Sequence, residues 1–200
     1  LSLSYDDNDG VLLGSFNKEL KIRYVGEYNL NKWVKITEDM TWSNRTARGV
    51  NTSGRTDGAV LSAVWMPSSA EAYKADGSFG GTFTEDPEYV SKYGSHAGIF
   101  GDVISPLRTL LGSQDINEQN NFWSTTGLEI HDIVKGLKFN SRYTFNRYQT
   151  FYKSFSTRRL EIGKPNDSNN LSYSTEKTYN WKTENTLTYD RTFGKHTVGA

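Results

Sequence analysis

The stretch TYNWKTENTLTYDRTFGKHTVGA, residues 178–200, decides the fold of this chain. Successive side chains of a β-strand point to opposite faces, so residues of one parity share a face. Gly194 lies in a predicted turn at residues 191–195, and the strand pattern resumes at His196. The stretch therefore predicts a long hairpin with one apolar and one polar face. The apolar parity holds Tyr179, Trp181, Leu187 and Tyr189, and the polar parity holds Lys182, Glu184, Thr186, Thr188 and Asp190.

The composition fits a protein whose apolar surface is thin. Hydrophobic residues make up 35% of the 200 residues, aromatic residues make up 14%, and mean hydropathy is −0.67. Few aliphatic and many aromatic residues are typical of chains that carry aromatic rings at membrane interfaces. The net charge is zero and no basic run occurs, so a nucleic-acid partner is not expected. There is no cysteine, which excludes disulfides and thiolate metal sites in these residues.

The same alternation recurs along most of the chain. Apolar residues alternate with charged ones at residues 19–30, again at residues 34–43, and again at residues 121–132 and 137–146. Residues 1–5 also alternate, and the acidic run at residues 6–10 is expected to end that first strand. Since both termini lie in alternating runs, we expect the chain to be an interior piece of a larger β-structure of roughly seven strands.

Connections of very different length separate these strands. Short ones are expected at residues 29–32, 133–136 and 191–195, and larger ones at residues 6–15, 45–120 and 153–176. Antiparallel neighbours place every second connection at the same end, so one end holds only tight turns. Outer-membrane β-barrels have this asymmetry, with short periplasmic turns and long extracellular loops. The fold class predicted is all-β: a fragment of an antiparallel transmembrane β-barrel.

Several motifs strengthen this interpretation. NLNKWVKI at residues 29–36 resembles the turn-and-strand motif of SusC/RagA-type TonB-dependent transporters. AVWMP at residues 63–67, followed by AYKADGS at residues 72–78, resembles an extracellular segment of that family. Ser105-Pro106 stands where Asn-Pro is usual, after an unusually long spacer. KGLKF at residues 135–139 and LTYDRTFGKH at residues 187–196 resemble its strand–turn–strand signatures.

The resemblance implies an energised importer of the outer membrane of Bacteroidetes-type, Gram-negative bacteria. Such a protein takes up oligosaccharides or peptides, works with a SusD-like surface lipoprotein, and contacts the TonB complex through a plug. The plug and the barrel ends are absent from residues 1–200, so this piece would not transport alone. Neither catalysis nor a cofactor is expected.

Candidate contact residues come from the long loop. Exposed rings in the loop stack on sugars or form interfaces, although in a loop this long they also serve to pack the loop itself. Charged residues on the polar strand faces are expected to line the lumen. The loop candidates are Trp65, Tyr73, Asp76, Phe79, Tyr89 and Tyr93, and the lumen candidates are Lys21, Arg23, Lys138, Arg142, Lys182 and Glu184.

Motifs for metal binding or catalysis are not found. Aligning Asp9-Gly10 with a calcium-binding EF-hand loop puts Tyr5 and Phe16 at positions that need acids, so the acidic run is interpreted as a solvated turn. His96, His131 and His196 lack metal-ligand spacing. Two alternatives remain open from sequence: a soluble carbohydrate-binding β-sandwich, and a small complete outer-membrane barrel that acts as an adhesin.

Overall fold

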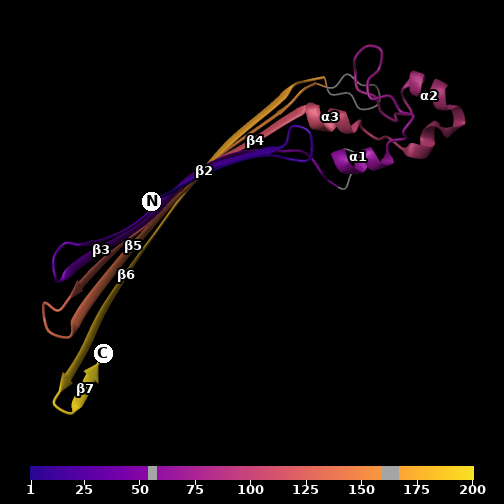
Figure 1. The fold of residues 1–200 in the computed structure, drawn as a ribbon. Helices are drawn as coiled ribbons and strands as arrows, with labels where there is room; N and C mark the ends of the chain where they lie inside the picture. Colours follow the sequence, from indigo (N-terminus) through magenta and orange to yellow (C-terminus); the bar gives the residue numbers. More distant parts are fainter. Residues whose placement is uncertain (54–57, 159–166) are drawn as a thin grey trace.

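The computed structural model describes residues 1–53, 58–158 and 167–200, and shows one open antiparallel sheet with a helical unit at one end (Figure 1). The seven strands follow one another in chain order, each hydrogen-bonded to the next. They are β1 (Ser2–Asp9), β2 (Phe16–Asn29), β3 (Val34–Gly49), β4 (Ser113–His131), β5 (Leu137–Ser156), β6 (Asn170–Phe193) and β7 (His196–Gly199). The all-β antiparallel prediction is confirmed.

The tight turns gather at one end of the sheet and the larger connections at the other (Figure 1). In the β2–β3 turn, the Asn31 side chain accepts hydrogen bonds from the backbone N–H groups of Trp33 and Val34, at 2.8 and 3.0 Å. Gly136 in the β4–β5 turn has φ +87°, which favours glycine, and a Cβ there would lie 2.3 Å from the Asp190 carbonyl oxygen. The turn residues at this end of the sheet therefore suit the backbone geometry of tight turns.

The strands are longer than the alternation predicts. The long connection spans residues 50–112 rather than 45–120, and the later one spans residues 157–169 rather than 153–176. Residues 54–57 and 159–166 of these two predicted loops lie outside the described residues. The acidic run also belongs to β1, because Asp7 pairs in register with Lys18, whose ammonium lies 2.9 Å from its carboxylate. The polar residues at the end of β1 therefore remain part of the strand because they pair with β2.

The register places the apolar residues of neighbouring strands in common rows. One row joins Ile22, Trp42 and Phe122 with Arg147 and Tyr179, and another joins Val34, Ile130, Phe139 and Leu187. We call this side of β2–β6 the apolar face. The opposite side, which holds Arg23, Thr41, Trp123, Asn146 and Asn180 in one row, is the polar face.

The apolar residues of the apolar face form a band that ends abruptly toward the helical unit. On β6 the band runs from Tyr189 to Tyr179, and the next residue on that face is Lys177. The matching row is polar on β3–β6, although Leu20 on β2 is apolar. Its polar members are Asn44, Asn120, Gln149 and Lys177. Trp42 and Tyr179 therefore lie at the edge of the band but well inside their strands.

Neither face of the sheet is covered by another layer within the described residues. Ser43 is the only strand residue that is buried there, and Trp181 and Leu187 on the apolar face are 70% and 63% exposed. The β-sandwich alternative needs a second sheet packed on the first, and the described residues form one sheet. The sheet is also open, because β1 pairs only with β2, and β7 pairs only with the last residues of β6.

Candidate functional site: the loop unit and the polar face

Residues 50–53 and 58–112 fold into a compact body that we call the loop unit. Its helices are α1 (Ala59–Trp65), α2 (Pro87–Tyr93), the 3₁₀ helix η1 (Gly94–Phe100) and α3 (Pro106–Leu111). Helix α1 ends just before Pro67, a residue that disfavours helix at the position before it. Phe83 and Val103 are buried at 2% and 0% exposure, and the Thr82 hydroxyl accepts a hydrogen bond from the Val103 N–H at 2.9 Å. The loop unit therefore has its own small core.

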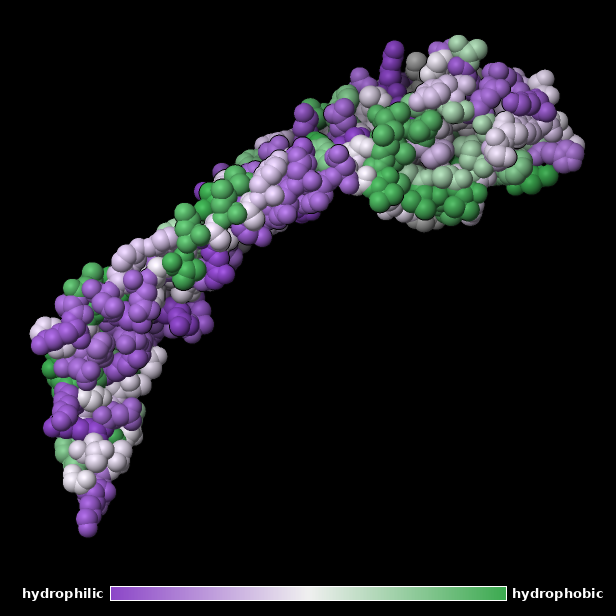
Figure 2. Space-filling model, viewed as in Figure 1, coloured by the Kyte–Doolittle hydropathy of each residue, from purple (hydrophilic) through white to green (hydrophobic). Residues whose placement is uncertain are grey.

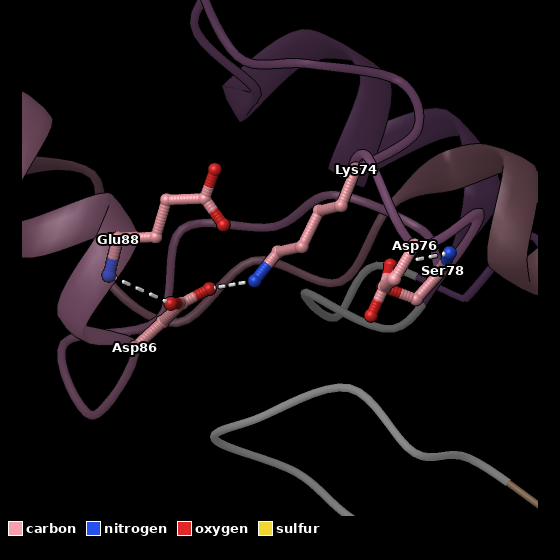
Figure 3. A network of polar contacts seen from close by, with 5 residues as sticks. All are labelled: Lys74, Asp76, Ser78, Asp86 and Glu88. Carbon is pink, nitrogen blue, oxygen red and sulfur yellow. Dashed lines mark hydrogen bonds and ion pairs between the residues drawn. The ribbon is translucent and has the colours of Figure 1, made fainter.

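A buried ion pair holds the loop unit together (Figure 3). The ammonium of Lys74 contacts the carboxylate of Asp86, and the two side chains are only 16% and 2% exposed. Asp86 also caps α2, since its other carboxylate oxygen accepts a hydrogen bond from the Glu88 N–H at 3.1 Å. The pair thus ties the segment before the Asp76 turn to the start of α2.

Asp76 occupies the turn of a short hairpin that is closed by the bridge between Tyr73 and Phe79. Its carboxylate accepts hydrogen bonds from the Ser78 hydroxyl and backbone N–H, at 2.6 and 2.9 Å. These bonds favour the ionised form and lower the pKa of Asp76 from its usual value. Gly77 has φ +82°, so the Asp-Gly sequence suits this turn. The carboxylate is therefore engaged within its own turn.

The aromatic candidates of the loop form two ring pairs rather than one platform. Tyr73 and Phe79 lie with ring centroids 5.3 Å apart, and Tyr89 and Tyr93 lie 4.7 Å apart. Tyr89 is 6% exposed, and its hydroxyl donates to the Ala97 carbonyl at 3.1 Å, so it serves the loop-unit core. Burial raises the pKa of the Tyr89 hydroxyl. Tyr73 and Trp65 remain accessible to solvent, at 50% and 49% exposure.

Two arginines that the sequence interpretation did not single out fasten the loop unit to the sheet. The Arg48 guanidinium donates to the carbonyls of Gly14, Leu110 and Ser113, at 2.9, 2.9 and 2.7 Å. Arg108 on α3 donates to the hydroxyl and carbonyl of Thr157 beyond β5, at 2.9 and 3.0 Å. Sequence gives no signal for these contacts, because each joins segments far apart in the chain.

Replacing Arg108 with alanine is expected to loosen the loop unit from the end of β5. Hydrogen bonds from a charged donor contribute about 1.5–3 kcal/mol each, and partial exposure reduces that here. Hydrogen exchange should quicken in residues 106–112 and change little in the β2–β3 turn. Unchanged exchange at α3 would show that Arg108 does not anchor the unit. Arg191, whose guanidinium lies 4.7 Å from the Phe193 ring at the far end of the sheet, provides the control substitution.

The predicted lumen residues all lie on the polar face, as their parity and the strand register require. Most of them are held in ion pairs. Arg23 lies 2.8 Å from Asp39, Lys138 lies 2.9 Å from Glu129, and Lys182 lies 2.7 Å from Glu184. The polar face is thus a charged wall whose acids and bases largely neutralise each other.

Two hollows indent this wall. One, of about 510 Å³, is lined by Lys35, Gly127, Asn140 and Glu184 among others, and the other, of about 700 Å³, by Glu27, Asp39, Trp123 and Lys182 among others. Thr37, Arg142 and Glu184 line both, so the hollows adjoin. Gly127 leaves space above the sheet here because it has no side chain. A Cβ at this position would lie 2.4 Å from the Thr37 hydroxyl oxygen.

Figure 2 shows that apolar side chains cover the loop unit around α1 and form separate patches along the sheet. Val60 and Val64 on α1 are 50% and 73% exposed. Among the described residues, no group of three or more His, Asp or Glu side chains is arranged to hold a metal ion. No helix within residues 1–53, 58–158 and 167–200 is long and apolar enough to cross a membrane.

Comparison with protein-family models finds no match to this chain, and a search of curated proteins finds no significant one.

Proposed function

We propose that this chain is part of a transmembrane β-barrel in a bacterial outer membrane. The observation that carries the proposal is the apolar band on one face of a single-layer sheet. The band runs from Tyr179 to Tyr189 on β6, about 11 residues, which is the length that a tilted strand needs to cross the hydrocarbon core. Acyl chains would cover the band, and the polar face would line a water-filled interior.

The two ends of the sheet indicate how the barrel would be oriented in the membrane. The tight turns would face the periplasm, and the loop unit and the other larger connections would lie outside the cell. Trp42 and Tyr179 would form part of the outer aromatic girdle, where rings with one polar edge are favoured, and Phe122 lies in the same row. The free edges of β1 and β6 would pair with further strands, because hydrocarbon does not tolerate unpaired backbone groups.

Within that class we propose a SusC/RagA-type TonB-dependent importer. The motif NLNKWVKI spans the β2–β3 turn, and AYKADGS forms the hairpin of the loop unit, at opposite ends of the sheet. The proposed partners are a SusD-like surface lipoprotein at the loop unit and the TonB complex acting through a plug. The proposed cargo is an oligosaccharide or a peptide. In this proposal no residue of the chain is catalytic, because the energy for transport is supplied through the plug.

The test is to follow the full-length protein in its native cells. We expect it in the outer-membrane fraction, with a mobility in gels that changes when the sample is boiled, and we expect a surface lipoprotein to co-purify with it. Deleting its gene should abolish uptake of one class of cargo, and removing TonB should have the same effect. A water-soluble protein without heat-dependent mobility would overturn the barrel. An outer-membrane barrel whose cargo uptake is independent of TonB would overturn the importer alone.

A further inference from the structure

The polar face leaves one of its strand cations without an acidic partner within the described residues. The Lys21, Arg23, Lys35, Lys138 and Lys182 side chains each lie within 3.5 Å of a carboxylate oxygen. Arg45 is held by the side chains of Asn17 and Gln119. Within the described residues, no ion pair or side-chain hydrogen bond engages Arg142, whose side chain is exposed and whose charge acts on the Glu184 carboxylate only at longer range.

The acids around Arg142 are already neutralised by other cations. Glu184 is its cross-strand neighbour on β6, but the Glu184 carboxylate lies 2.7 Å from the Lys182 ammonium. Glu27 lies 2.7 Å from Lys35. Glu129 and Asp39 are paired with Lys138 and Arg23, and Glu38 points to the apolar face, where Ser124 and Thr126 donate to it. Among the described residues, the guanidinium donors of Arg142 are therefore left free for another acceptor at the hollows.

The surroundings of Arg142 leave room for a ligand. Its cross-strand neighbour on β4 is Gly127, which has no side chain, and Arg142 lines both hollows. Asn140 and Thr37 lie on the same wall and supply neutral hydrogen-bonding groups. A guanidinium offers planar donors that match the two oxygens of a carboxylate, which makes arginine suited to binding this group.

We propose that Arg142 is the anchoring residue of a binding site for a carboxylate-bearing ligand on the polar face. The proposal rests on the proposed function and narrows its cargo to molecules that carry a carboxylate. Two sources share this chemistry, the C-terminus of a peptide and the uronic acid of a glycan. Arg142 would bind the carboxylate through two parallel N–H donors, and Asn140 and Thr37 would contact the neutral groups beside it.

The experiment compares Arg142→Gln and Arg142→Lys in the full-length protein, purified in detergent, by calorimetric titration. The probes are short peptides with free or amidated C-termini, and oligogalacturonate or its methyl ester. We expect the wild type to bind one acidic probe, at least tenfold more weakly once its carboxylate is amidated or esterified. Arg142→Gln should lower the affinity for that probe at least tenfold. Arg142→Lys should retain part of the affinity, since the charge remains but the paired donors are lost.

Lys138→Gln is the matched control, because Lys138 is a cation of the same strand and face that already has an acidic partner. Its affinity for the probe should stay within about twofold of the wild type. Loss of binding in both Arg142→Gln and Lys138→Gln would show that the probe responds to the overall charge of the polar face. That result would overturn the site. Equal binding of the acidic and neutral probes, or no binding of either acidic probe, would also overturn it. These outcomes leave the barrel and TonB tests untouched, so the two proposals fail separately.

Discussion

Replacing Phe145 with arginine is expected to destabilise the membrane-embedded protein by about 1–2 kcal/mol. Arginine on the lipid face of a β-barrel costs about 2–4 kcal/mol near the midplane of the bilayer and about 0–1 kcal/mol near its interfaces, and Phe145 lies one row inside the row of Trp42 and Tyr179. Phe145 lies in the apolar band of β5, in one row with Met40 and Trp181, and its ring lies 6.2 Å from that of Phe122. The substitution would expose a cation to acyl chains and remove this ring contact.

The next residue of the strand provides a matched control. Asn146 is adjacent in sequence but lies on the polar face, in one row with Arg23 and Asn180. Asn146→Arg should change stability by less than about 0.5 kcal/mol, as surface substitutions usually do. Urea titration of both variants in lipid vesicles measures the difference. Equal losses at the two positions would contradict the assignment of the two faces.

Replacing Asp86 with alanine is expected to unfold the loop unit while the sheet survives. The substitution leaves the Lys74 ammonium without its partner in a largely buried site, which costs about 3–5 kcal/mol. It also removes the cap of α2, worth about 1 kcal/mol. A unit with so small a core has little stability in reserve, so we expect rapid protease cleavage within residues 58–112.

Two further variants separate the ion pair from general surface charge. Glu85→Ala removes the exposed carboxylate next to Asp86 and should leave protease resistance within about twofold of the wild type. The double variant Lys74→Met with Asp86→Leu replaces the pair by apolar groups and should recover much of the resistance, since no buried charge then remains. Limited proteolysis followed by mass spectrometry locates the cleavage sites. Cleavage of Asp86→Ala at the wild-type rate would mean that the pair does not hold the unit together.

The two faces of the sheet follow from the sequence because the strand period is two residues and the hairpins keep neighbouring strands in register. Parity alone assigns Lys182 and Trp181 to opposite faces, and the structure agrees. Strand ends are less predictable, since they depend on the partner strand. Asp7 continues β1 because Lys18 lies opposite, although an acidic run normally indicates a turn.

The interior of the loop unit was only partly predictable. Asp86-Pro87 is a recognisable helix start, because aspartate caps a helix and proline suits its first turn. Nothing in the sequence pairs Asp86 with Lys74, since that contact depends on how the intervening hairpin folds back. Burial of a ring in the loop unit also depends on this folding. The sequence therefore made Tyr89 a candidate contact residue, whereas its ring is buried in the structure.

Lipid exposure along β6 tests the central claim most directly. Residues 1–200 contain no cysteine, so in full-length protein with any other cysteine replaced, single cysteines placed from Tyr179 to Tyr189 give defined sites for spin labels in vesicles. We predict a period of two: labels at odd positions respond to oxygen dissolved in the bilayer, and labels at even positions respond to a water-soluble nickel complex. Labels of both parities that respond only to the nickel complex would contradict a membrane-facing apolar band.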